Sequence, residues 1–320
     1  MTYSSGSVIV DDDYNTFVTG NAAGTGDNNV ANVNTVWGTG ATTRGWGQSG
    51  TISPVSAGNT ITATQWASLL NRMNTLSNHT GVSITAISNP STGDTISAYT
   101  ALQTNITNLF NSSTFAAAQG TSLTTNGTTQ TTSAWSATAT TSKTFTFASA
   151  NALRYFFNAG GQLTIAFSRT GGTASAQNTA WTNLLTAVGT LYYSGNGSSK
   201  TIGGSTFFGF TKVGGSGTPT VFVENTGVQN FTPGAAATTV FTQVATTYLY
   251  LSNNIVITAS LNAGSTAFTI NVTLNDVSTP GSDVVDGTLT MTTALIQPST
   301  TYITNTWGTP TMNATSWSLT

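Results

Sequence analysis

The pattern of apolar and polar positions divides the chain into two regions. Up to about residue 111, apolar side chains recur at helical spacing between glycine-rich loops. From about residue 143, apolar residues alternate with Thr, Ser and Asn, which is the period of a half-buried β-strand. The pattern predicts an α+β protein, with a short helical N-terminal region (1–111) followed by an antiparallel β-sandwich or jelly-roll-like domain (143–320).

The clearest helix of the first region starts at residues 62–65, which read TATQ. This is a capping box, in which the Thr and Gln side chains satisfy backbone N–H groups that have no partner in the helix. Gly81 fits the end of the helix. Four apolar residues at helical spacing are expected to be buried, within the chain or between copies: Trp66, Leu69, Leu70 and Met73.

Two further helices are expected in this region. One runs from Asp94 or Thr95 to Asn111, with Leu102 and Ile106 on its apolar side. An earlier short helix begins at the three aspartates of residues 11–13, because carboxylates stabilise a helix N-terminus. Helices this short need packing partners, so their apolar stripes are expected to contact each other or helices of neighbouring copies.

Residues 112–142 form a tract of Ser, Thr, Ala, Asn and Gly with few large apolar side chains. The tract is either a linker or an extended segment that lies along a neighbouring subunit. We therefore expect the boundary between the helical and β regions at residues 112–145.

Strand patterns recur beyond this tract. The cleanest alternation places Phe268, Ile270, Val272 and Leu274 on one face of a strand. One helix interrupts the strands, with Asn178 or Thr179 as its cap and Gly189 at its end. The other expected strands are 143–147, 163–167, 207–213, 220–223, 240–251, 255–261 and 288–296.

Charge is scarce in this chain. Only 5% of the residues are Asp, Glu, Lys or Arg, against about a quarter in typical soluble domains. The apolar fraction is ordinary and the net charge is −2, so the composition does not indicate disorder. A neutral surface of hydroxyl and amide groups carries little charge repulsion, which favours association between copies.

The residues that could carry out catalysis are few. His79 is the only histidine, which excludes a multi-histidine metal site, and we interpret it as a cation near the end of its helix. Glu224 is the only glutamate. No catalytic residue, cofactor site or transition-metal site is therefore predicted, and there is no cysteine.

Two weaker alternatives concern binding. Asp276, Asp283 and Asp286 lie close in sequence and form either a calcium loop or a polar turn, and the turn is favoured because the spacing matches no recognised calcium loop. The Trp and Tyr side chains form either a sugar-stacking platform or part of the core, and the core is favoured. The first residues do not resemble a signal peptide, and neither a membrane span nor a basic patch for nucleic acid is present.

Several stretches of the chain are distinctive: 56–66 (SAGNTITATQW) with 69–72 (LLNR), 93–99 (GDTISAY), 155–161 (YFFNAGG), 168–172 (SRTGG) and 178–181 (NTAW). These stretches resemble virion structural proteins of marine T-even-like cyanophages and their relatives. This resemblance implies a component of the virus particle with no known enzymatic activity.

These observations favour a non-enzymatic, self-associating structural component of a bacteriophage virion, assembled in the bacterial cytoplasm. A tail, neck or fibre-like appendage ranks above a capsid decoration protein. We expect a homo-oligomer, a trimer or a ring-like array, that also contacts other virion proteins. The alternatives are a phage adhesin whose β domain binds host-surface glycan, which an exposed aromatic patch beside Asn and Asp would favour, and a glycan-degrading enzyme, which needs two facing carboxylates in a cleft.

Overall fold

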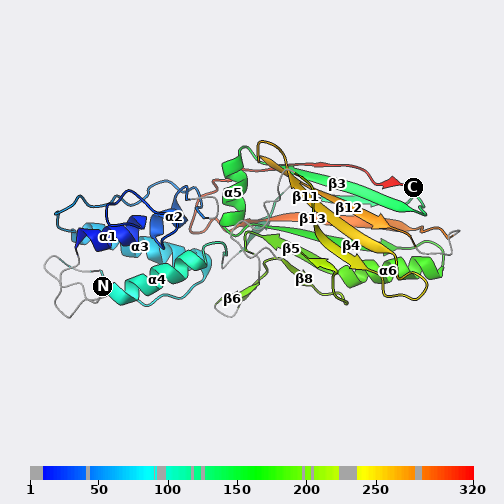
Figure 1. The fold of residues 1–320 in the computed structure, drawn as a ribbon, viewed down its shortest axis with the longest axis horizontal. Helices are drawn as coiled ribbons and strands as arrows, with labels where there is room; N and C mark the ends of the chain where they lie inside the picture. The colour runs from blue at the N-terminus through cyan, green and yellow to red at the C-terminus, as the bar shows by residue number, and fades with distance from the viewer. Residues whose placement is uncertain are drawn as a thin grey trace.

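The computed structural model shows an elongated molecule, with a helical region at one end and a strand-rich region that also carries α5 and α6 at the other (Figure 1). The predicted α+β fold with an antiparallel β-sandwich is confirmed. The helical region comprises the described residues up to 116, and the β region comprises those from 119 onward. The structure describes residues 10–40, 44–89, 91, 99–116, 119–123, 127–196, 199–202, 205–222, 236–277 and 283–320.

The helical region contains α1 (Asp11–Thr19), α2 (Val33–Trp37), α3 (Ala63–Thr80) and α4 (Tyr99–Asn111). The capping box of α3 is confirmed, because the Thr62 hydroxyl accepts from the Gln65 N–H and the Gln65 side chain accepts from the Thr62 N–H. Gly81 ends α3 in the left-handed conformation, with φ at 69°. The expected start of α4 at Asp94 or Thr95 lies outside the described residues.

The apolar stripes of these helices pack inside the chain. α3 and α4 contact each other, and the indole of Trp66 lies against the ring of Tyr14 from α1, with 6.4 Å between the ring centroids. Burial within one chain explains why helices this short are stable. The six side chains expected in the packing are all buried: Trp66, Leu69, Leu70, Met73, Leu102 and Ile106.

The β region is built from two antiparallel sheets. In the first sheet β13 pairs with β4, and the strands are β1 (Gln119–Ser122), β2 (Gly127–Thr131), β4 (Gln162–Thr170), β5 (Thr190–Ser194), β8 (Thr211–Val213) and β13 (Thr288–Pro298). In the second sheet β12 lies between β3 and β11, and the strands are β3 (Thr138–Thr146), β9 (Val221–Phe222), β10 (Thr238–Val244), β11 (Asn254–Leu261), β12 (Ala267–Asn275), β14 (Thr311–Ala314) and β15 (Ser318–Leu319).

Buried apolar side chains of both sheets, such as Ile165 of β4 and Ile270 of β12, belong to one hydrophobic core. Phe145 of β3 pairs with Phe268 of β12, and their rings stack at 4.9 Å. Every second residue of β12 is fully buried from Phe268 to Leu274, as the alternation predicts. A separate hairpin consists of β6 (Lys200–Ile202) and β7 (Ser205–Phe207).

Most of the expected linker at residues 112–142, from residue 119 onward, is instead part of the β region. β1 and β2 lie within it and pair with β13, and β3 begins at Thr138 and pairs with β12. Thr suits a pleated, half-buried surface, so a strand can form here with few large apolar residues. The low hydrophobicity of this tract therefore concealed its strands.

Other elements also differ from expectation. Helix α5 (Ala150–Asn158), capped by Ser149, was not anticipated. Helix α6 (Ala176–Val188) is capped by Ser175 rather than by Asn178 or Thr179, because the Ser175 hydroxyl accepts from the Asn178 N–H. The strand expected at 240–251 ends at Val244, where the chain turns back into β11. The strand expected at 207–213 is divided between β7 and β8.

Candidate functional site

Trp46 lies at the contact between the helical and β regions. Its side chain is fully buried, and the indole N–H is shared between the carbonyl oxygens of Ser113 at 2.7 Å and Asn158 at 3.1 Å. The Asn158 side chain donates in return to the carbonyl of Gly45. We refer to Trp46, His79, Asn158 and Ala159 as the junction cluster. It joins a loop of the helical region to the end of α5.

His79 is the charge-sensitive member of the junction cluster. Its Nε2 lies 3.0 Å from the Ala159 carbonyl oxygen, which can only accept, so Nε2 carries the proton. The imidazole meets the indole of Trp46 edge to face, with 4.6 Å between the ring centroids. Burial lowers the pKa of His79 to about 4, although the hydrogen bond to Ala159 acts in the opposite direction. The interpretation of His79 as a cation is wrong, because the buried ring lacks the solvation that a charge requires.

The C-terminal segment also joins the two regions. The Gln48 amide donates to the Thr304 carbonyl at 3.0 Å and accepts from the Thr304 N–H at 2.9 Å. The Thr306 hydroxyl donates to the Trp46 carbonyl, and Arg154 of α5 donates to the Arg44 carbonyl. Segments far apart in sequence therefore hold the helical region in place with well-formed hydrogen bonds.

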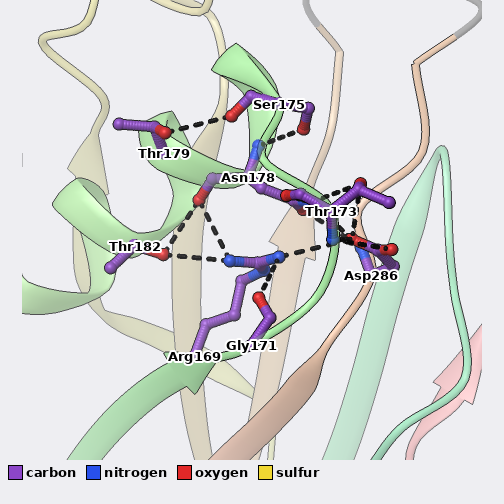
Figure 2. Close-up of polar contacts among 8 residues, drawn as sticks. All are labelled: Arg169, Gly171, Thr173, Ser175, Asn178, Thr179, Thr182 and Asp286. Carbon is purple, nitrogen blue, oxygen red and sulfur yellow. Dashed lines mark hydrogen bonds and ion pairs between the residues drawn. The ribbon is translucent and has the colours of Figure 1, made fainter.

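A second polar cluster lies beside α6, at the end of the molecule away from the helical region (Figures 1 and 2). We call Arg169, Thr173, Asn178 and Asp286 the Arg169 cluster. Asp286 accepts from the Thr173 N–H at 3.0 and 3.1 Å, from its hydroxyl at 3.1 Å and from the Asn178 amide, and it forms an ion pair with Arg169 at 3.4 Å. These donors lower the pKa of Asp286. Through these bonds the loop between β4 and α6 is held against the residues that precede β13.

The three carboxylates of the alternative calcium loop, Asp276, Asp283 and Asp286, bond to different partners. The Asp276 carboxylate is buried and accepts from the amides of Gln177 and Asn253, and burial raises its pKa. The Asp283 carboxylate accepts from the Tyr250 hydroxyl at 3.0 Å. Within the described residues, no group of three or more His, Asp or Glu side chains is placed to hold a metal ion. The geometry favours a polar turn, since N–H and O–H donors occupy carboxylate oxygens that a cation would need.

Most of the basic side chains donate hydrogen bonds to the chain itself, and Lys143 and Arg169 are buried. Lys143 of β3 is 0% exposed and reaches across the sandwich to the Gly127 carbonyl at 2.5 Å and the Thr293 hydroxyl at 3.0 Å. Burial lowers the pKa of Lys143 to about 8. Of the seven basic residues in the sequence, six donate to carbonyl oxygens of the chain: Arg44, Arg72, Lys143, Arg154, Arg169 and Lys212. The side chain of the seventh, Lys200, is not described.

Two neighbouring loops, after β10 and after β12, carry most of the strongly exposed apolar side chains. We call these side chains the tip patch: Tyr248, Leu249, Leu251, Val277 and Val284. Tyr248 is 80% exposed, and Leu249 has a φ of 75°, which is unusual for a bulky residue. The Val277 N–H donates to the Asn253 side chain, and this bond ties the loops together.

The tryptophans do not form a sugar-stacking platform. Six of the seven are buried, and Trp37 is half-buried under the guanidinium of Arg72. Tyr248 of the tip patch is the most exposed aromatic side chain that the structure describes. Asp94 and Glu224 lie outside the described residues, so the structure does not place them.

The comparisons with known proteins give no relative. No family model, curated protein or solved structure matches this chain. Among the described helices, none combines the length and the apolar character needed to cross a bilayer.

Proposed function

We propose that this protein is a non-enzymatic structural component of a bacteriophage virion that associates with copies of itself, as part of a tail, neck or fibre-like appendage. The observation that carries the proposal is that the few basic side chains bond to the chain itself. Six of the seven basic residues donate hydrogen bonds to carbonyl oxygens of the same chain. Few of the described basic groups are therefore left to attract or repel a neighbouring copy.

A neutral polar surface suits a subunit packed among other subunits. Thr, Ser and Asn side chains can be buried between copies when they find hydrogen-bond partners, without the desolvation cost of ions. The few charges also leave little electrostatic repulsion between copies. An interface made this way should respond weakly to salt.

The stretches that resemble cyanophage virion proteins coincide with shape-determining contacts. Residues 155–161 contain Asn158 and Ala159 of the junction cluster, and Gly160 has a φ of 102° where a Cβ atom would approach the Ala116 nitrogen to 2.7 Å. Residues 168–172 and 178–181 contain Arg169 and Asn178 of the Arg169 cluster. Because these stretches contain residues that hold distant segments of the chain together, they support a structural role.

The test is mass measurement across a dilution series at low and high ionic strength. We expect a homo-oligomer that persists at micromolar concentration and dissociates no more readily in high salt. A stable monomer would contradict the self-association. Dissociation caused by salt alone would contradict the neutral-surface argument. A map of the whole particle tests whether the protein lies in an appendage or decorates the capsid.

The tip patch favours a second candidate function, an adhesin that binds host-surface glycan. Tyr248 offers an exposed ring for stacking, and Asp283 lies on the adjoining loop. Four of the five patch side chains are aliphatic, which places this candidate second. Glycan-array binding tests it with Tyr248→Ala, and with Tyr302→Ala as a control because Tyr302 is also exposed, at 43%, but lies outside the patch. Array binding lost only in Tyr248→Ala would support the adhesin, and no binding by the unmodified chain would exclude it.

A further inference from the structure

His79 occupies a position where its two protonation states favour opposite arrangements of the molecule. The neutral imidazole fits the closed junction, where Nε2–H donates to Ala159 and the ring packs on Trp46. Nδ1 is buried with no hydrogen-bond partner among the described residues. A proton added at Nδ1 would therefore place an unsatisfied donor and a charge inside the contact.

The described segments that form the junction contain no carboxylate that could stabilise that charge. The sequence has no acidic residue between Asp27 and Asp94, so the loop at 44–48 and helix α3 have none. Three further segments complete the contact and also lack acidic residues: 112–116, 150–160 and 303–307. The other charged or titratable side chains on these segments are three cations and a phenol: Arg44, Arg72, Arg154 and Tyr155.

The same charge is favourable once His79 reaches water. His79 lies in the last turn of α3, where a cation is stabilised by the helix dipole. An open arrangement, with the helical region parted from α5, provides both hydration and this interaction. Protonation and separation of the two regions therefore favour each other.

We propose that the junction is a pH-sensitive contact, in which proton uptake by His79 below about pH 6.5 loosens the attachment of the helical region to the β region. The contact is tight at neutral pH and opens increasingly on acidification. The pKa of about 4 in the closed form, against 6.5 for an ordinary histidine, corresponds to a shift in the open-to-closed ratio on the order of a hundredfold.

The first measurement uses the unmodified protein. Because His79 is the only histidine, its imidazole gives a single set of NMR signals. We expect neutral-form signals with the proton on Nε2 down to about pH 5. A titration midpoint near 6.5 in the folded protein would overturn the proposal, since the closed form would then tolerate the charge.

The second measurement is hydrogen exchange at bonds that cross the junction, corrected for the intrinsic pH dependence of exchange. The probes are the Trp46 indole N–H and the Thr304 N–H, and the reference is the Val285 N–H, which bonds to Trp135 at the far end of the β region. From pH 6.5 to pH 4 we expect the protection of both probes to fall on the order of a hundredfold, with the reference nearly unchanged.

His79→Gln is the matched variant, because its amide can donate to Ala159 and does not titrate. In this variant we expect the protection of the Trp46 indole N–H and the Thr304 N–H against hydrogen exchange to change by less than about threefold over the same pH range. An equal loss of protection in the variant and the unmodified protein, or no loss in either, would overturn the proposal. If His79→Gln does not fold, His79→Phe keeps the ring contact with Trp46 and takes its place under the same criterion.

Discussion

The junction cluster and the Arg169 cluster hold together distant segments by different means. The junction cluster is fully buried and uncharged, and its hydrogen bonds end on backbone carbonyl oxygens. The Arg169 cluster contains an ion pair whose acidic partner is 29% exposed. A neutral buried contact is disrupted when one of its groups acquires a charge, whereas a charged contact at the surface is disrupted when a charge is lost.

The two clusters should also differ in how much stability is lost when one hydrogen-bonding side chain is removed. In the junction cluster, truncation leaves a cavity and buried carbonyl oxygens that water cannot reach. In the Arg169 cluster, water can partly replace a missing donor at Asp286. Substitutions in the two clusters and at the buried Lys143 test this comparison.

Trp46→Ala should have the largest effect. The variant loses the packing on His79 and leaves the Ser113 and Asn158 carbonyls without their donor. Truncation of a buried tryptophan typically lowers the free energy of unfolding by about 3–5 kcal/mol. Urea denaturation measures the loss. Trp37→Ala is the control, because Trp37 is only half-buried, and an equal loss in both variants would contradict the special role of the junction.

Lys143 tests a charge placed in a fully buried site. Its pKa of about 8 in the folded protein lies below the ordinary 10.5, so between these values the unfolded chain binds more protons than the native state. The free energy of unfolding should therefore rise with pH across this window, by roughly 3 kcal/mol. Denaturation at pH 8 and at pH 10.5 measures the rise. Lys143→Met should lack it, and the same rise in both proteins would contradict the assignment.

Arg169→Met should have a smaller effect than Trp46→Ala. It removes donors to Asn178, Thr182 and Asp286 but keeps an apolar side chain against the sheet. Hydrogen bonds to charged groups contribute about 2 kcal/mol, which we expect as the loss in free energy of unfolding. Lys212→Met, which loses donors to two loop carbonyls, is the control and should change stability less. A loss as large as that of Trp46→Ala would invalidate the comparison between the clusters.

Asp286→Asn should have the smallest effect, and the effect should depend on pH. The pKa of Asp286 is lowered by the Asn178 and Thr173 donors, so its carboxylate stabilises the fold above its ordinary pKa of 3.8. This contribution is lost as the pH falls through the lowered value. The difference in Tm between the unmodified protein and Asp286→Asn should be largest near pH 7 and shrink as the pH falls below 3.8. A difference that grows with acidification would contradict the sign of the shift.

The predictability of the two clusters from sequence differs from that of the helices and strands. The core of α3 was predictable because Thr62, Gln65 and the apolar stripe from Trp66 to Met73 act within one helix. Neither cluster was predictable, because their members lie far apart in sequence. Trp46 and Asn158 are 112 residues apart, and Arg169 and Asp286 are 117 apart.

His79 shows what a local interpretation omits. Its place in the last turn of α3 is visible in the sequence, and a cation there is reasonable for an exposed helix end. The structure covers that end with Trp46 and Ala159, and the neutral ring is then favoured. A composition with so few acidic residues was the available indication that no carboxylate would accompany a buried charge.

The sequence by itself determined the order of helical and β regions, the cap and core face of α3, and the alternation of β12, because these depend on periods of 3.6 and 2 residues within single elements. It also determined the scarcity of charge. Only the tertiary structure decided that residues 119–142 contribute strands to both sheets, that Lys143 is buried across the sandwich, and that His79 is neutral. Burial and hydrogen-bond partners arise from contacts between segments distant in the chain, and these contacts set the pKa of a buried group.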